Sequence, residues 1–199
     1  MAICLRNAPE GYGLVAILLH WLVALLVIGL FSLGLWMVEL NYYDPWYRSA
    51  PHIHKGTGVL LFVLVSCRLL WRFLNPTPVD EPDLGRVERL LAHASHLLLY
   101  LLLFAVMVSG YLIPTADGRP VDVFGLFEVP ALLYGIPNQE DIAGQFHYLL
   151  ALSLIGLASL HALAALKHHF HDHNRTLLKM LIPLHRPHPN PEIRKRRRP

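Results

Sequence analysis

Charged residues are scarce in this sequence and unevenly placed. Asp, Glu, Lys and Arg make up 16% of the chain, whereas an ordinary soluble domain carries roughly 25%. Four long stretches are nearly free of charge, and most charged residues lie between them. This distribution argues against a soluble core and indicates a membrane protein.

Each of these stretches is long enough to cross a hydrocarbon layer, which needs about 20 apolar residues. The 199 residues leave room for one domain. We therefore expect an all-α fold, an integral membrane four-helix bundle in residues 1–183 followed by a basic tail in 184–199. The predicted helices cover about 12–38, 55–74, 90–113 and 142–167.

Cysteine is also scarce, with two residues in the chain. Cys4 precedes the first stretch and Cys67 lies within the second, so we expect free thiols rather than a disulfide framework. The first stretch is too long for a secretion signal and has no small-residue cleavage pattern after it, so we expect a retained anchor.

Basic residues are concentrated on one side of the predicted bundle. Four spans place both termini on the same side, which holds 14 of the 17 Lys and Arg residues. The positive-inside rule therefore predicts that both termini are cytoplasmic. The basic run Arg194–Arg198 is typical of a segment lying against anionic lipid headgroups, and we expect no nucleic-acid partner.

Acidic residues are absent from the interiors of the spans, whereas the chain has 13 histidines. A zinc site usually needs three or four ligands, commonly including Cys, Asp or Glu. The composition therefore disfavours a zinc site and a carboxylate proton relay. A histidine-based metal transporter remains an alternative.

Two histidines of the fourth stretch, His147 and His161, are 14 residues apart. That spacing places them within about 40° of one helix face and about 21 Å apart along the axis. His20 in the first stretch matches the depth of His161, and His54 at the start of the second matches His147. Two imidazoles from different helices suit bis-histidine haem ligation.

Other residues compete with or complement these pairs. His93 and His96 lie on one helix face, and either could be an inner ligand or serve a quinone site, with His96 the alternative to His20. His52 is an alternative to His54. Arg68 lies 14 residues after His54 and could pair with a haem propionate near the cytoplasmic side. The other possibility for this arginine is that its charged end reaches the headgroups.

Several segments of the chain resemble the prokaryotic cytochrome b561 family. The resemblance covers nearly the whole chain up to about Pro183. The matching segments are LLHWLVALLV around His20, HKGTG from His54, SCRLLWRFLNPTP from Ser66, LAHASHLLLYLLLFAVMVSGYL around His93 and His96, VFGLFEVP in the outer loop, and FHYLLALSLIGLASLHALAALKHHF from Phe146.

The resemblance implies four transmembrane helices and two b-type haems in the bacterial inner membrane. It implies iron ligation by His20 and His161 for the inner haem and by His54 and His147 for the outer haem. Members of the family move electrons, and one type oxidises superoxide and reduces ubiquinone. We therefore expect a haem oxidoreductase or electron carrier that passes electrons from an outer-face donor to the quinone pool.

The outer segments bear on the donor. They carry seven acidic residues against Arg48, Lys55 and Arg119, a formal charge of about −4, which counts against superoxide. Lys55, Arg48 and His52 could still form a local positive entrance. The other redox hypothesis is a cytochrome subunit of a larger dehydrogenase or hydrogenase complex. The apolar run 121–133 predicts a lid on this face.

Overall fold

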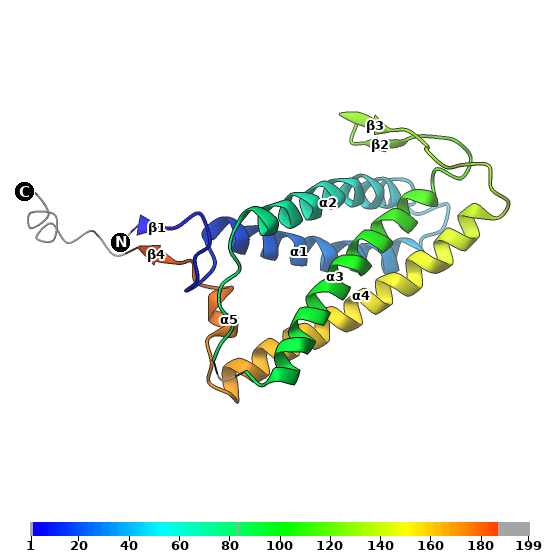
Figure 1. Ribbon diagram of the computed structural model, residues 1–199. Coiled ribbons are helices and arrows are strands. Elements are labelled where there is room, and N and C mark those ends of the chain that lie inside the picture. The colour runs from blue at the N-terminus through cyan, green and yellow to red at the C-terminus, as the bar shows by residue number, and fades with distance from the viewer. Residues whose placement is uncertain (1, 83, 187–199) are drawn as a thin grey trace, which may run out of the picture.

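The structure is a computed structural model that describes residues 2–82 and 84–186. Its four long helices are long and apolar enough to cross a membrane, and the prediction of an all-α membrane bundle is confirmed. The predicted tail lies outside the described residues after position 186. The helices are α1 (Leu14–Met37), α2 (Ser49–Leu74), α3 (Arg86–Leu112) and α4 (Gln139–Phe170) (Figure 1).

Three helices begin several residues before the apolar stretches that predict them. Pro51 lies in the first turn of α2, where its missing N–H leaves no helical bond unmade. At the start of α3 the Glu88 carboxylate accepts a hydrogen bond from the Gly85 N–H. Glu140 and Asp141 occupy the first turn of α4, where the helix dipole favours negative charge. The polar first turns thus extend each helix beyond its apolar stretch.

The helices pack most extensively as two pairs, α1 with α2 and α3 with α4, and the two pairs lie side by side (Figure 1). A small core of Val23, Leu61, Val65, Leu103 and Leu154 joins all four helices. Many large apolar side chains on the outside of the bundle are exposed, including Leu25 and Leu163. Such a surface suits acyl chains rather than water.

Both ends of the described chain lie at one end of the bundle (Figure 1). β1 (Ala2–Ile3) pairs antiparallel with β4 (His185–Arg186). The short helix α5 (Thr176–Lys179) lies close by, and the indole N–H of Trp21 donates to the Met180 carbonyl at 2.8 Å. We call this the inner end and the opposite one the outer end.

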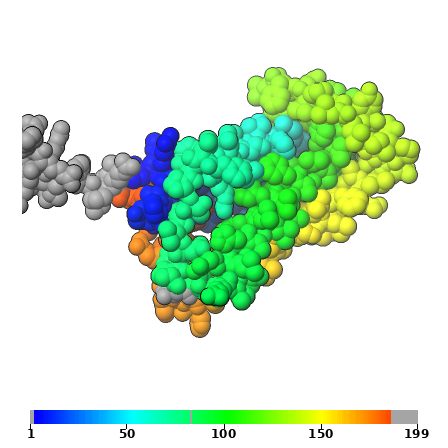
Figure 2. Space-filling model, in the orientation of Figure 1, coloured from blue at the N-terminus to red at the C-terminus, as the bar shows by residue number. Residues whose placement is uncertain are grey.

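A β-hairpin covers part of α2 near the outer end (Figure 2). It consists of β2 (Val121–Val123) and β3 (Phe127–Val129) and accounts for most of the apolar run predicted as a lid. Phe124 and Gly125 form its turn with φ values of 56° and 70°. The Phe124 ring packs on Gly56, where an added Cβ would lie 2.9 Å from the ring.

Candidate functional site

Two histidines from different helices face each other near the outer end. His54 comes from the second turn of α2 and His147 from the third turn of α4. Their ring centroids are 6.1 Å apart. A metal–imidazole bond is about 2 Å long and a ring centroid lies about 1 Å behind its nitrogen, so trans imidazoles on one metal have centroids about 6 Å apart. His54 and His147, which we call the outer pair, match this spacing.

The hydrogen bonds of the outer pair leave a nitrogen of each ring available. His147 Nδ1 donates to the Val106 carbonyl at 2.9 Å, so the neutral ring keeps the lone pair of Nε2. Such a bond also fixes the orientation of a ligating imidazole. His54 Nδ1 is buried and has no hydrogen-bond partner among the described residues.

Two glycines make room for these rings. A Cβ at Gly110 of α3 would lie 2.8 Å from the nearest atom of the His147 ring, and a Cβ at Gly34 of α1 would lie 3.2 Å from the His54 ring. Gly29 and Gly156, by contrast, have open space where a Cβ would stand. The glycine cradle, Gly34 and Gly110, is therefore specific to the outer pair. The sequence contains both glycines, but only helix packing assigns them this role.

The inner end holds three histidines and an arginine. His161 of α4 contacts His96 of α3, with ring centroids 5.1 Å apart. His20 of α1 accepts a hydrogen bond at Nδ1 from Arg68 Nη2 at 3.0 Å. The same guanidinium donates through Nε to the Tyr100 hydroxyl at 3.0 Å. The structure thus brings all the predicted inner residues to one region, with His96 as the ring neighbour of His161.

The contact between Arg68 and His20 fixes the tautomer of that histidine. Arginine only donates hydrogen bonds, so Nδ1 of His20 must be the acceptor and the proton of the neutral ring lies on Nε2. A ring in this form cannot offer Nε2 to a metal. Ligation through Nε2 therefore requires Arg68 to leave Nδ1, for example to reach a negatively charged group.

The remaining candidate histidines are engaged elsewhere. His52 Nε2 bonds the Asp122 carboxylate of the β2–β3 hairpin at 2.7 Å, and this hydrogen bond holds the pKa of Asp122 below its usual range. His93 Nδ1 lies 2.7 Å from the Arg89 carbonyl of its own helix. His52 thus ties the hairpin to α2, and neither side chain completes a pair with His147 or His161.

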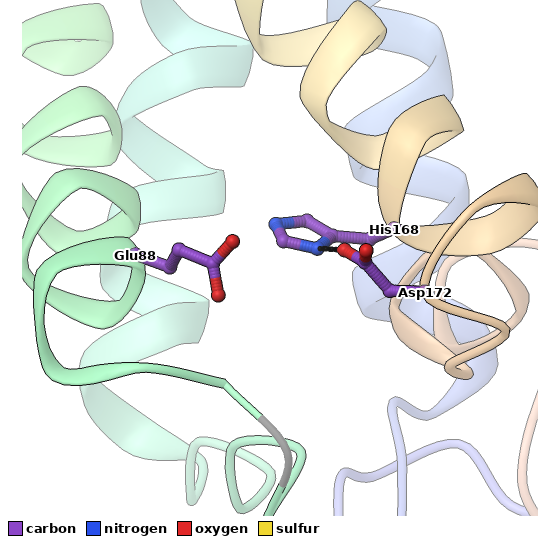
Figure 3. Close-up of side chains that lie close together, drawn as sticks. All are labelled: Glu88, His168 and Asp172. Carbon is purple, nitrogen blue, oxygen red and sulfur yellow. Dashed lines mark hydrogen bonds and ion pairs between the residues drawn. The ribbon is translucent and has the colours of Figure 1, made fainter.

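A further cluster lies where α3 begins and α4 ends. Figure 3 shows Glu88, His168 and Asp172 directed toward one another. Lys167 Nζ lies 2.8 Å from Glu88 Oε1 and 2.9 Å from Asp172 Oδ2, and the hydrogen bond from this ammonium lowers the pKa of Asp172. Because a cation already pairs both carboxylates, we interpret the cluster as an ion-pair tie between helices.

The histidine nitrogens of the two regions suit haem better than other metals or cofactors. Each region offers imidazoles from different helices within apolar surroundings, and the outer pair has the spacing and the free nitrogens that two histidine ligands of one haem iron would need. Glu88 and Asp172, two carboxylates near the inner end, are already paired in the tie. The residues present therefore fit a b-type haem.

Comparison with known proteins gives a consistent result. Residues 11–182 match the model of the family described as prokaryotic cytochrome b561. The chain is 51% identical to cytochrome b561 homolog 2 of Escherichia coli over 88% of this chain and 93% of that protein. It is 34% identical to the probable superoxide oxidase CybB of Yersinia pestis over 86% of this chain and 96% of that protein.

Proposed function

The chain belongs to the prokaryotic cytochrome b561 family of haem-binding membrane cytochromes, and on that premise we propose that it carries two b-type haems and transfers electrons between an outer donor and the quinone pool. The observation that carries this proposal is the outer pair, whose centroids lie 6.1 Å apart. Haem when bound supplies one-electron redox chemistry, and the protein sets ligation and surroundings.

In this proposal α4 holds one ligand of each haem. His147 and His54 would hold the outer haem, and His161 and His20 would hold the inner one. Arg68, which donates to His20 Nδ1, would be the partner for a propionate of the inner haem. Its 3.0 Å hydrogen bond to the Tyr100 hydroxyl holds the guanidinium in the inner region.

We further propose that the inner end of the bundle faces the cytoplasm and that the membrane is the bacterial inner membrane. Most basic residues of the described chain lie at the inner end, and the positive-inside rule links such loops to the cytoplasm. The electron donor would then approach from the periplasmic side, beside the outer pair.

Superoxide is the donor that we propose, because a relative is named a probable superoxide oxidase and because of two outer cations. Arg119 pairs with Asp117, and His52 pairs with Asp122. Within the described part of the chain, Arg48 and Lys55 form no ion pair, and Lys55 is exposed directly after His54. A free ammonium at this place attracts a small anion toward the outer pair.

A larger complex is the second candidate. The outer hairpin and the segment after it expose Leu126 and Leu132 at 78% and 80%, and apolar groups this exposed beyond a span suit a protein partner. The chain would then be the cytochrome subunit of a dehydrogenase or hydrogenase.

One experiment separates these functions. The purified full chain, with haem quantified, is supplied with superoxide and a soluble ubiquinone, and both are followed optically. Superoxide loss coupled to quinone reduction supports the proposed function, and a Lys55→Glu variant should slow it, more strongly at low ionic strength. A chain with haem that catalyses neither reaction supports the subunit role instead.

A further inference from the structure

The β2–β3 hairpin contacts both helix pairs at the outer end. On one side, β2 packs on α2, where the Phe124 ring lies against Gly56 and the Asp122 carboxylate accepts a hydrogen bond from His52 at 2.7 Å. On the other side, α3 holds the segment that follows β3. An isolated two-stranded hairpin is only marginally stable, so these contacts with the helices fix where the hairpin lies.

A tyrosine in the last turn of α3 makes the second of these attachments. The Tyr111 hydroxyl donates to the Pro130 carbonyl at 2.6 Å and accepts from the Leu132 N–H at 2.8 Å. Tyr111 directly follows Gly110, where an added Cβ would lie 2.8 Å from the His147 ring. The hairpin is therefore attached to the same part of α3 that contacts His147.

The turn of the hairpin has a backbone conformation that a phenylalanine rarely adopts. Phe124 and Gly125 have φ values of 56° and 70°, which glycine and asparagine adopt more readily. Strained residues persist where the surrounding contacts over-determine them. Here that contact is with α2, since an added Cβ at Gly56 would lie 2.9 Å from the Phe124 ring. The position is thus occupied by a residue that suits the contact better than the turn.

The hairpin contacts the side of α2 that lies opposite His54. His52 and Gly56 are four residues apart and share one face of the helix, and the hairpin contacts both. His54 lies between them in sequence and points about 160° away from Gly56, toward His147. The Phe124 ring therefore supports the helical turn that carries His54 from behind.

These contacts form a closed loop that begins and ends at the outer pair. His147 donates to the Val106 carbonyl of α3 at 2.9 Å, and Tyr111 of α3 holds the hairpin. Phe124 of the hairpin contacts α2, and α2 carries His54. The two rings belong to different helix pairs, so a connection between the pairs at this end constrains the position of one ring relative to the other.

We propose that the β2–β3 hairpin fixes the spacing and the ring angle of the outer pair, with Phe124 as a positioning residue that acts on His54 through Gly56. The inference rests on the proposed function, which makes the outer pair the ligands of a haem. Contacts behind a ligand set its orientation and tune the metal that it holds. Retention and reduction potential of the outer haem therefore depend on a side chain that touches neither ring.

The first test removes the Phe124 ring without straining the turn. Phe124→Gly deletes the side chain, and glycine readily adopts a φ of 56°. Ferric EPR spectra of the haem-loaded full chain are recorded, and the outer haem is identified by the signal that is lost in His147→Ala. The largest g value of such a haem depends on the angle between its two imidazole planes, which is 81° in the outer pair.

We expect Phe124→Gly to lower the largest g value of the outer haem, because rings held almost perpendicular relax toward smaller angles. Its midpoint potential should shift as well, whereas both values of the inner haem should stay the same. An equal change at both haems would indicate a general loosening of the bundle and would contradict the inference.

The second test disturbs the same contact from α2. Gly56→Ala places a Cβ 2.9 Å from the Phe124 ring, whereas a Cβ at Gly58 meets no atom of the described residues within 4 Å. Both variants gain the same helix propensity, so Gly58→Ala is the matched control. We expect Gly56→Ala to change the outer EPR signal and to speed transfer of the outer haem to apomyoglobin about threefold, and Gly58→Ala to change neither.

Combining the two substitutions tests whether they act through one contact. In Phe124→Gly the ring is absent, so adding Gly56→Ala should have no further effect on the outer haem. Additive effects in the double variant would show that Gly56 acts on His54 without Phe124, and would overturn the assignment of Phe124 as the positioning residue.

An outer haem with an unchanged signal and potential in both Phe124→Gly and Gly56→Ala would overturn the inference, even if the Tm falls, because the hairpin would then contribute only to stability. Equal effects of Gly56→Ala and Gly58→Ala would overturn it as well. Either result, with two haems bound and electron transfer intact, would leave the proposed function standing. Absence of haem from the unmodified chain would instead remove the proposed function itself.

Discussion

The outer and inner histidine regions share one helix but differ in how they are prepared for a ligand. At the outer end, the ring centroids of His54 and His147 are 6.1 Å apart, and a glycine lies beside each ring. At the inner end, His161 has His96 as its ring neighbour, and His20 is held by Arg68. The outer pair thus has the spacing that two ligands of one metal would need, whereas in the inner region Nδ1 of His20 already accepts a hydrogen bond from Arg68.

The difference shows that matching depth and helix face are not sufficient for a ligand site. The ring nitrogens must also have the right hydrogen-bond partners, because the tautomer decides which nitrogen can bind metal. A backbone carbonyl at His147 favours ligation through Nε2, and a guanidinium at His20 opposes it. Variants in each region can therefore test whether the outer and inner histidines differ in this way.

Replacing one of the proposed haem ligands on α4 should have the largest effect. We expect His147→Ala to lose the outer haem and His161→Ala to lose the inner one, so each keeps about one haem per chain and the double variant keeps none. Pyridine haemochrome quantification against protein concentration provides the count. A His147→Ala protein that retains two haems would contradict the assignment of the outer pair.

Filling the glycine cradle should have the next largest effect. The added Cβ of Gly110→Ala meets the His147 ring at 2.8 Å, so the ring must shift and the outer haem should be partly lost or spectrally altered. Gly156→Ala, where the Cβ meets nothing, is the matched control for the gain in helix propensity of about 1 kcal/mol. If both variants have the haem content of the unmodified chain, the cradle has no role in ligation.

The inner region can be resolved by comparing two histidines. We expect His20→Ala to lose the inner haem and His96→Ala to keep it with a shifted spectrum, because His96 is then a neighbour of the ligand His161 and not a ligand. Low-temperature difference spectra, in which the two haems separate, provide the measurement. The reverse result would make His96 the ligand and leave His20 as the partner of Arg68.

The smallest effect should come from the exposed ion-pair tie between the start of α3 and the end of α4. The pKa of Asp172 is lowered from its ordinary value of 3.8 by Lys167, so its contribution to stability is present above that value and is lost as the pH falls through the lower, folded-state pKa. We expect Asp172→Asn to lower the Tm slightly at pH 6 and the two proteins to converge once the pH falls below the lowered, folded-state pKa of Asp172. Exposed ion pairs contribute little, so the shift should also fade in high salt.

The sequence predicts some features of this molecule well. Four apolar stretches are sufficient to predict the bundle, because a bilayer demands about 20 apolar residues per span. The spacing of His147 and His161 places one imidazole toward each end of α4, because helical rise and rotation are fixed. The predicted meeting of His54 and His147 agrees with the contact in the structure.

Other features depend on how each helix is rotated against its neighbours. The contact of His96 with His161, the hydrogen bond from Arg68 to His20 and the clearance at Gly110 all arise from packing that no single-helix pattern contains.

The central claim is that α4 provides one ligand to each of two b haems. A redox titration of the purified full chain, followed by absorbance and normalised to protein concentration, tests it most directly. We predict two b-type haems per chain that titrate as two one-electron steps, one of which disappears in His147→Ala and the other in His161→Ala. A single haem in the unmodified chain, or the loss of the same step in both variants, would contradict the claim.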